Sequence, residues 1–567
     1  MIDSLLHGWS GVAFAFSAVE VPLLAGLARG RSAYRHYFLS PLVAAPLTAI
    51  VAGGVGLSSF GLAHVGFSHH GLLQWTVGTA LSTYLGYRGG RAIAESREEQ
   101  KSHQRGSFIA PVAPARDTVL RANDRARDAA LSLAGTRIPV EDEAKHFKLI
   151  GATGTGKSTA IQEIVAGSLA RGDRAVIADP DGGYLRRFYR PDRGDIVLNP
   201  FDERSVKWDL FAEIKNGYDV EQLARSMIPD HEGQDRSWRG YARTFFAAVM
   251  RQMHEAGAGD TAELYRLLVI ADSAELRGLV RGTPAQPFLD EHNARMFDSI
   301  RSVTSSAVGS LQYVARQKAS DFSVREWVKS DSPGVLFIPY KAGQIASLRS
   351  TISAWMRLAI FETMDQDVRT DAPPCDRGRD PDSRLWFVVD ELDALGQIDG
   401  LKDALARLRK FGGRCVLGFQ SVAQVSSTYG HDEAHTIVEN CGNTLILRCS
   451  ASEGGGTARF ASQLIGEREV LHTTVSRSRR PTEFFTSVTR SEHRSVEATV
   501  LASQIEQLPD LAGYLKYASN PVWQQVRLDA TRAWEQHRSQ QAAPAGAGPA
   551  HTPPHPPERT RERGENE

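Results

Sequence analysis

The chain has 567 residues, enough for several domains of roughly 150 residues each. Charged residues make up 23% and apolar residues 42%, which is ordinary for a globular protein with a sizeable core. Lysine plus arginine equals aspartate plus glutamate at 66 each, so net charge argues neither for nor against nucleic acid, and any basic surface must be local. The cysteines form no C-x-x-C pair, which favours reduced thiols over a metal site or disulfides.

Three apolar runs occupy the first ninety residues. The run 39–67 carries no acidic residue, lysine or arginine, and about 20 apolar residues suffice to cross a bilayer. The run 71–87 is uncharged but shorter, and we expect it to form a hairpin with the first. The run 8–28 contains Glu20 and Pro22. Its alternative interpretations are a third span, an interfacial helix and a re-entrant segment. Buried helices of a soluble domain are the alternative for all three.

The charges that flank these runs indicate on which side of the membrane each flank lies. The loop between the two spans has no lysine or arginine, whereas basic residues flank the pair on both outer sides, namely Arg29, Arg31, Arg35, Arg88, Arg91, Arg97, Lys101 and Arg105. By the positive-inside rule both flanks are cytoplasmic. The start lacks the basic region of a cleaved signal peptide. We therefore predict a transmembrane anchor of two or three helices at 1–95, followed by a polar linker at 96–135 and cytoplasmic domains.

A phosphate-binding loop follows the linker. The segment 146–159 reads HFKLIGATGTGKST and fits G-x-x-x-x-G-K-[ST] between an apolar strand and a helix. Its glycines let backbone N–H groups turn toward phosphates, and the helix N-terminus favours anions. Lys157 would reach the β- and γ-phosphates, and the Ser158 hydroxyl would ligate Mg²⁺. A chance glycine-rich turn is the alternative. The predicted nucleotide-binding residues are Gly151, Gly154, Thr155, Gly156, Lys157, Ser158 and Thr159.

Strand and helix signals then alternate, which indicates a largely parallel α/β sheet at 136–215 and 330–535. Between these parts, at 216–329, strand signals vanish and apolar residues recur at helical spacing, which predicts an all-helical insertion. Its basic residues could contact a phosphate backbone, although solvated helix faces explain them equally well: Arg236, Arg239, Arg243, Arg301, Arg316 and Lys318.

Two strand ends carry the predicted chemistry. The apolar run 385–389 ends in Asp390 and Glu391, where an aspartate can hold the Mg²⁺ shell and a glutamate can orient or deprotonate the attacking water. The next strand ends at Gln420, which fits a polar residue that senses the γ-phosphate. An ordinary amide in a turn is the alternative for Gln420.

Arg409 lies at the end of the predicted helix between these two strands. A basic residue there is favourable next to a helix C-terminus, which is one explanation for it. The other makes Arg409 an arginine finger that completes the site of a neighbouring subunit and predicts a closed ring. Arg448, at the end of the following strand, is a second candidate for that role.

The longer segments resemble one family. Several segments of the chain are together similar to the type IV coupling proteins of conjugation systems, particularly the TraD/TrwB-type branch. They are the phosphate loop, VIADPDGGYLRRFY, DIVLNPFDERSVKWDLF, LWFVVDELDAL, ARLRKFGGRCVLGFQSVAQVSSTYG and QIEQLPDLAGYL. The resemblance implies a RecA-like P-loop NTPase domain with an all-helical insertion and an anchor in the bacterial inner membrane. By position, it implies roles for the phosphate-loop lysine, the Mg²⁺-side hydroxyl, the acidic pair, the arginine finger and the sensor glutamine at Lys157, Ser158, Asp390, Glu391, Arg409 and Gln420.

The resemblance also implies a function. Members are hexameric ATPases, with ATP and Mg²⁺ as cofactors, that bring relaxase-bound DNA to a type IV secretion channel and pump it. We expect salt-sensitive contacts to the phosphates of single-stranded DNA, with double-stranded DNA as an alternative, and no sequence readout. The short tail at 536–567 is mixed in charge and predicted to be disordered, in contrast to the long acidic tail with which some members dock the relaxosome.

Three other functions are alternatives to this one. A ring motor could act on protein substrates or move chromosomal DNA in cell division, and a membrane receptor could recruit the relaxosome with nucleotide as an assembly switch. The helical insertion argues against the cell-division motors. The intact Lys157, Asp390, Glu391 and Gln420 argue against the receptor.

Overall fold

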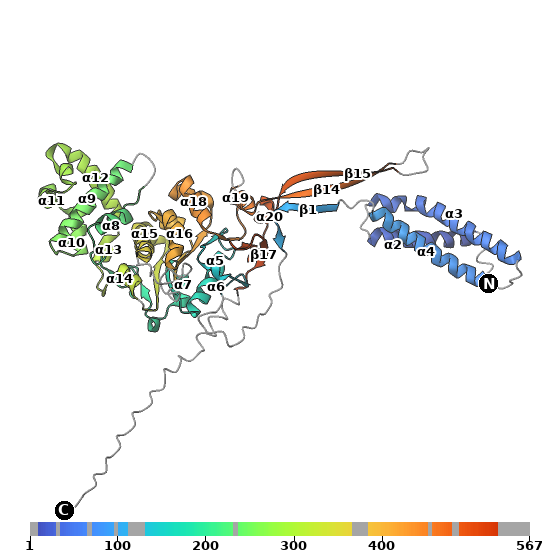
Figure 1. Ribbon diagram of the computed structural model, residues 1–567, viewed down its shortest axis with the longest axis horizontal. Helices are drawn as coiled ribbons and strands as arrows, with labels where there is room; N and C mark the ends of the chain where they lie inside the picture. The colour runs from blue at the N-terminus through green and yellow to red at the C-terminus, as the bar shows by residue number, and fades with distance from the viewer. Residues whose placement is uncertain are drawn as a thin grey trace, which may run out of the picture. The chain divides into compact units, whose positions relative to one another are not determined.

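The computed structural model describes residues 9–29, 34–64, 71–95, 100–110, 131–230, 236–330, 332–365, 384–451, 456–478 and 487–530. The chain divides into two compact units (Figure 1). The first comprises residues 1–106 and 468–497, and the second comprises 107–467 and 498–567. The predicted tail at 536–567 lies outside the described residues.

Among its described residues, the first unit contains three helices and a small sheet. Helix α2 (Trp9–Arg29) packs against α3 (Tyr34–His64) and α4 (Gly71–Glu95). The sheet has the order β1-β14-β15, formed by β1 (Gln100–Gly106), β14 (Glu467–Ser478) and β15 (Ser487–Ala498). Strand β1 runs antiparallel to β14 and pairs Gln100 with Thr473. Part of the predicted linker at 96–135 is therefore a strand, and its partner comes from far along the sequence.

The helices predicted near the N-terminus are present, but their predicted membrane crossing is not supported. Within the described part of the chain, no helix combines the length and the apolar content needed to cross a bilayer. Helix α2 contains Glu20 and Pro22, and α4 contains Arg88. The side chains at 53–64, and residues 65–70 of the predicted span and loop, lie outside the described part.

The second unit is built on a ten-stranded sheet of order β2-β17-β16-β13-β5-β12-β11-β6-β10-β7. The seven strands from β13 to β7 are mutually parallel, β16 and β17 are antiparallel additions, and β2 runs parallel to β17. In this order the strands are β2 (Ile109–Ala110), β17 (Trp523–Arg527), β16 (Ala512–Lys516), β13 (Asn443–Ile446), β5 (Phe147–Ile150), β12 (Gly413–Phe419), β11 (Leu385–Val389), β6 (Arg174–Pro180), β10 (Val335–Tyr340) and β7 (Ile196–Val197).

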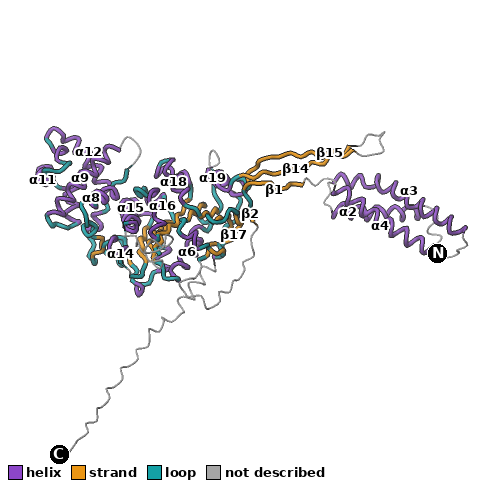
Figure 2. The backbone as a smooth tube through the Cα atoms, viewed as in Figure 1, coloured by secondary structure: helices purple, strands orange, loops and turns teal. Residues whose placement is uncertain are grey.

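The central strand β11 is apolar along its whole length because both faces of the sheet are covered. Along β11, Phe387 packs into one core and its neighbours Trp386 and Val388 pack into another, as expected when successive side chains point to opposite faces. Figure 2 shows the strands of this sheet with helices on either side. The covering helices are α5 (Val140–Glu143), α6 (Lys157–Ala170), α7 (Gly183–Phe188), α15 (Ala342–Met364), α16 (Leu401–Leu408), α17 (Val422–Tyr429), α18 (His431–Asn440), α19 (Gly456–Ile465) and α20 (Ala502–Glu506).

A helical segment interrupts the sheet between β7 and β10 (green in Figure 1). It contains α8 (Asp219–Met227), α9 (Arg236–Glu255), α10 (Thr261–Tyr265), α11 (Ser273–Leu279), α12 (Ala294–Val308), α13 (Leu311–Ala315) and α14 (Val324–Lys329). The two-residue strands β8 (Lys207–Trp208) and β9 (Asp321–Phe322) pair where the chain enters and leaves it. Phe245 and Phe297 of this segment share one continuous core with Trp355 of α15. The α/β class with a helical segment is thus confirmed.

Short elements complete the described chain. A two-stranded sheet joins β3 (Ser132–Leu133) to β4 (Thr136–Arg137). The π-helical turn η3 (Arg266–Ile270) follows α10. The single 3₁₀ turns are η2 (Pro191–Arg193), η4 (Gln286–Leu289), η5 (Glu291–Asn293), η6 (Asp393–Leu395) and η7 (Arg409–Phe411). The last two adjoin predicted site residues, because η6 follows the predicted acidic pair and η7 carries the predicted arginine finger.

Candidate functional site

The predicted phosphate loop connects β5 to α6 at the carboxyl edge of the sheet. Gly154 and Gly156 have φ angles of +78° and +110°, which only glycine adopts at little cost. A Cβ atom on Gly156 would lie 2.7 Å from Leu511 Cδ2. The loop therefore needs glycine at this position both for its backbone conformation and for the close approach of Leu511.

Backbone hydrogen bonds fix this loop from two sides. The Ala152 N–H donates to the carbonyl of Arg448 over 2.8 Å, and the Leu511 N–H donates to the carbonyl of Thr155 over 3.0 Å. Leu511 itself has a φ angle of +63°, which is rare for a side chain of this size. The segments after β13 and before β16 thus hold the loop in place.

Asp390 lies at the end of β11, where two hydroxyl groups reach the same carboxylate oxygen. Ser158 Oγ donates to Asp390 Oδ2 over 2.5 Å, and Tyr184 Oη donates to it over 2.9 Å. The other oxygen, Oδ1, is buried and has no hydrogen-bond partner among the described residues. The predicted pair of Mg²⁺ ligands, Ser158 and Asp390, is therefore assembled, with one carboxylate oxygen left available.

Tyr184 is held in position by Asp179, at the end of β6. The Asp179 carboxylate accepts the backbone N–H groups of Tyr184 and Leu185 over 3.1 and 2.7 Å, so it caps the first turn of α7. Burial raises the pKa of Asp179 to about 6, although these N–H groups oppose the rise. Burial, together with the charge of Asp390, raises the pKa of Tyr184 well above its usual value, so its hydroxyl stays protonated and donates to Asp390.

Lys157 is the buried cation of the site. Its side chain is 6% exposed, and Nζ has no hydrogen-bond partner in the described structure. Burial lowers the pKa of Lys157, whereas the neighbouring charges of Asp390, Glu391 and Asp393 raise it. A buried ammonium without a partner is costly, so the position calls for a bound anion.

Glu391 and Gln420 contact one another beside the loop. Gln420 Nε2 donates to Glu391 Oε1, and Gln420 Oε1 accepts from Thr153 Oγ1 over 3.1 Å. Burial raises the pKa of Glu391; the charge of Lys157 opposes this effect, and that of Asp390 reinforces it. Strand β12 lies between the phosphate-loop strand β5 and the acidic strand β11, so its last residue is placed to contact both. Gln420 therefore links the phosphate loop to the carboxylate predicted to act on water.

A cavity of about 220 Å³ joins these groups. Its lining includes Gly156, Lys157, Ser158, Asp390 and Glu391. The two unpartnered atoms, Lys157 Nζ and Asp390 Oδ1, fit a phosphate anion and a divalent cation respectively, because the first is a buried cation and the second is a hard carboxylate oxygen. The residues present therefore fit the predicted ATP and Mg²⁺.

Arg409 and Arg448 occupy different places. Arg409 is exposed in η7, at the edge of the sheet where β12 begins. The phosphate loop lies at the opposite edge, where the parallel strands end. The seven residues of β12 separate these edges by about 20 Å at ~3.3 Å per residue. Arg448 lies beside the loop but forms an ion pair with Asp510 over 2.6 Å. Within one chain, then, Arg409 cannot reach its own phosphate loop.

Sequence reasoning did not select three residues that the structure places at this site. Tyr184 donates to Asp390, Asp179 caps the start of the helix that carries Tyr184, and Leu511 lines the cavity. The segment DPDGGY carried a signal for the first two, since a carboxylate at a strand end precedes a helix start. Leu511 lies far along the chain in an irregular turn and gave no such signal.

Comparisons with known proteins agree with this geometry. A family model described as the type IV secretion-system coupling protein DNA-binding domain matches residues 130–529. The coupling protein TraD of Escherichia coli strain K12 is 29% identical over 395 residues, which is 69% of this chain and 53% of that protein. The chain spans about half the length of the curated relatives it matches.

Solved structures show the same fold. An unbound form of the bacterial conjugative coupling protein TrwB superposes with a TM-score of 0.65 at 30% identity, over 76% of this chain and 94% of that one. The plasmid coupling protein TrwB in complex with ADP and Mg²⁺ superposes with a TM-score of 0.64 at 30% identity, with the same coverage of 76% and 94%.

Proposed function

The chain belongs to the type IV secretion-system coupling proteins, and on that premise we propose that it is a RecA-like ATPase that moves relaxase-bound DNA to a secretion channel. Its match to the family model extends over residues 130–529, which include the phosphate loop, the acidic pair and the helical segment. The relatives TraD and TrwB are described as coupling proteins, and TrwB has been solved with ADP and Mg²⁺.

One observation carries the proposal: a single cavity is lined by an unpartnered lysine, an unpartnered carboxylate oxygen and a candidate catalytic glutamate. Lys157 would bind phosphate oxygens, and Ser158 and Asp390 would hold Mg²⁺. The ion would neutralise charge on the β- and γ-phosphates. Glu391, held by Gln420, would orient water and accept its proton.

We further propose that the active form is a homo-hexameric ring. The exposed position of Arg409 on the edge of the sheet opposite the phosphate loop supports this, because its predicted role requires a site on another subunit. The DNA partner would be bound through its phosphates, and the relaxase and the channel components would be protein partners of the whole assembly.

The test is ATP hydrolysis by the full-length protein with and without single-stranded DNA. We expect DNA to raise the turnover rate and high salt to weaken this stimulation, because phosphate contacts release counterions. A chain with Lys157→Ala, purified in the same way, corrects for contaminating ATPases. Hydrolysis indifferent to DNA would instead indicate a motor for protein substrates. Nucleotide binding without hydrolysis under any condition would indicate a nucleotide-switched receptor.

Tyr184→Phe should raise the Mg²⁺ concentration that ATP hydrolysis requires, without unfolding the protein. The substitution removes the hydroxyl that donates to Asp390 Oδ2 and leaves the ring in its buried position. Loss of a group that orients a metal ligand typically weakens metal affinity by about 10- to 100-fold. We expect the Mg²⁺ concentration that gives half-maximal hydrolysis to rise by about tenfold.

Tyr517→Phe is the matched control for this variant. Tyr517 is also buried, and its hydroxyl donates to the carbonyl of Thr136 over 3.1 Å, outside the phosphate-loop cavity. Equal Mg²⁺ dependence in the two variants would contradict the assignment of Tyr184 to the metal site.

A further inference from the structure

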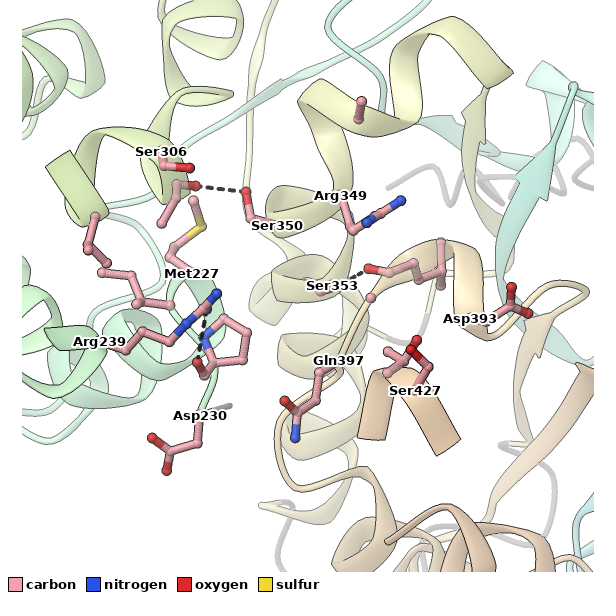
Figure 3. A pocket seen from close by; sticks show the side chains of 18 of the residues that line it. Met227, Asp230, Arg239, Ser306, Arg349, Ser350, Ser353, Asp393, Gln397 and Ser427 are labelled. Carbon is pink, nitrogen blue, oxygen red and sulfur yellow. Dashed lines mark hydrogen bonds between the residues drawn. The ribbon is translucent and has the colours of Figure 1, made fainter. Parts of the chain in front are cut away.

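A second and larger cavity lies between the helical segment and the α/β part of the same unit. It has a volume of about 650 Å³ and is formed by α8, α9 and α12 on one side and by α15, η6 and α17 on the other. Figure 3 shows Arg239 on the helical side and Arg349 on α15 across from it. We call this cavity the arginine cleft.

Both arginines retain N–H donors that make no hydrogen bond to the described residues. Arg239 makes one long hydrogen bond, from Nη1 to the carbonyl of Pro229 over 3.4 Å. Arg349 donates through Nε to the carbonyl of Ala394 over 3.1 Å. Among the described residues no acidic side chain forms an ion pair with either of them, so neither guanidinium charge has a direct acidic partner.

The surroundings of the cleft are also basic. Among the described lining residues, the acidic one on the helical side is Asp230, which is paired with Arg243 over 2.5 Å. Burial raises the pKa of Asp230, but the hydrogen bond from Arg243 and the charges of Arg243, Arg236 and Arg225 hold it below its usual value. The other acidic lining residue is Asp393. Three arginines of α8 and α9, namely Arg225, Arg236 and Arg243, thus compensate the charge of this carboxylate.

The lining matches the chemistry of a phosphodiester backbone. Besides the two arginines it carries hydroxyl groups that donate to no described carbonyl, those of Ser302, Ser306 and Ser427, whereas Ser350, Ser353 and Thr428 donate to the carbonyls of Ala307, Leu395 and Gln424. Arginine and hydroxyl groups are the usual partners of nucleic-acid phosphates. Within the described part of the chain, the lining contains no aromatic residue on which a base could stack. A strand bound here would be held by its phosphates, without sequence preference and with strong salt dependence.

Helix α15 connects this cleft to the catalytic carboxylates. Ser353 Oγ donates to the carbonyl of Leu395 over 2.5 Å, and Arg349 binds the preceding carbonyl, so two side chains one helical turn apart hold η6. The turn η6 begins two residues after Glu391. On its other side, α15 binds the helical segment through Ser350 Oγ, which donates to the carbonyl of Ala307 over 2.8 Å.

We propose that the arginine cleft binds the phosphate backbone of single-stranded DNA, and that Arg349 and Ser353 relay its occupancy through η6 to Glu391. A strand that draws the Arg349 guanidinium toward its phosphates changes the support of η6, and therefore the position of Glu391. This deepens the proposed function, on which it rests, by naming where the strand is held and how it raises hydrolysis.

Binding of a labelled single-stranded oligonucleotide to the full-length protein, followed by fluorescence anisotropy at several salt concentrations, tests the cleft. We expect Arg239→Ala to weaken affinity by about tenfold, the value of one charged hydrogen bond. The slope of log affinity against log salt should fall by about 0.7, the value for one phosphate contact with a single strand.

Arg251→Ala is the matched control. Arg251 lies on the same helix, α9, but forms an ion pair with Glu221 and does not line the cleft. Unchanged DNA affinity and salt slope in Arg239→Ala, with the protein folded, would overturn the proposal. Loss of binding to an acidic peptide with DNA binding intact would also overturn it and would assign the cleft to a protein partner.

The relay is tested separately by Ser353→Ala, with Thr363→Val as its control. Both remove a hydroxyl from α15, but Thr363 Oγ1 donates within the helix, to the carbonyl of Ala359. We expect Ser353→Ala to bind DNA with near-normal affinity and to lose at least half of the ratio of stimulated to unstimulated hydrolysis. A normal ratio would refute the relay. If the wild-type protein shows no stimulation by DNA, the proposed function itself fails, so the two failures are distinguishable.

Discussion

Glu391→Gln should reduce ATP hydrolysis by about 1000-fold while nucleotide binding is retained, because loss of a positioned general base typically costs 10²–10⁴. The amide keeps the size of the side chain and can still contact Gln420, but it cannot accept a proton from water. Single-turnover hydrolysis and equilibrium binding of a labelled nucleotide separate the two effects. A similar loss of hydrolysis and of nucleotide binding would mean that Glu391 binds nucleotide.

Glu433→Gln is the control for this variant. Glu433 is a half-buried carboxylate that accepts a hydrogen bond from Gln397, and burial raises its pKa too, but it lies outside the phosphate-loop cavity. We expect near-normal hydrolysis from this variant. An equal loss in both glutamine variants would point to disturbed packing in place of a missing base.

The direction of the pKa shift adds a pH dependence to the same prediction. As the proposed base, Glu391 would act on water only when it is deprotonated, and burial raises its pKa. The rate should therefore fall as pH decreases through this raised pKa, at a higher pH than for a solvent-exposed carboxylate. In the Glu391→Gln chain, the residual rate of hydrolysis should not fall in this way as the pH decreases.

Arg409→Ala should cause the second large loss, about 10³-fold or more, which is the range measured for arginine fingers. Within one chain Arg409 lies about 20 Å from the phosphate loop along β12, so the loss requires an assembled ring. Arg407→Ala, an exposed arginine two residues away on the same turn of chain, should retain most of the activity.

Mixing two inactive chains distinguishes a role in a neighbour's site from a role in folding. A ring that contains both Arg409→Ala and Glu391→Gln chains includes sites whose glutamate comes from the first chain and whose arginine comes from the second. We expect partial recovery of hydrolysis on mixing. No recovery, with mixed rings shown to form, would exclude Arg409 as a finger acting between subunits.

Much of the site was predictable because its chemistry is local in sequence. The phosphate loop spans a few residues, and Asp390, Glu391 and Gln420 each follow a buried apolar strand. Parallel strands bring their carboxyl ends to one edge of the sheet, so these side chains had to meet. The helical segment was predictable for a similar reason, since its apolar stripes keep helical spacing over many residues.

The parts that sequence did not reveal depend on contacts between distant segments. Leu511 reaches Gly156 only because β16 and β13 pair in the folded sheet. Strand β1 was assigned to a linker because its sequence is polar, and it is a strand through pairing with β14. The membrane anchor was predicted from apolar runs, but the described helices do not reach the apolar content that a span requires.

The chain passes between its two units at residues 106–107, 467–468 and 497–498. A protein shortened to begin at Ser107 would lose β1 and leave the edge of β14 without its partner. Open strand edges pair with other molecules, so such a fragment would tend to aggregate for reasons unrelated to ring assembly. A shortened protein for biophysical work should therefore replace the 468–497 hairpin with a short turn as well as remove residues 1–106.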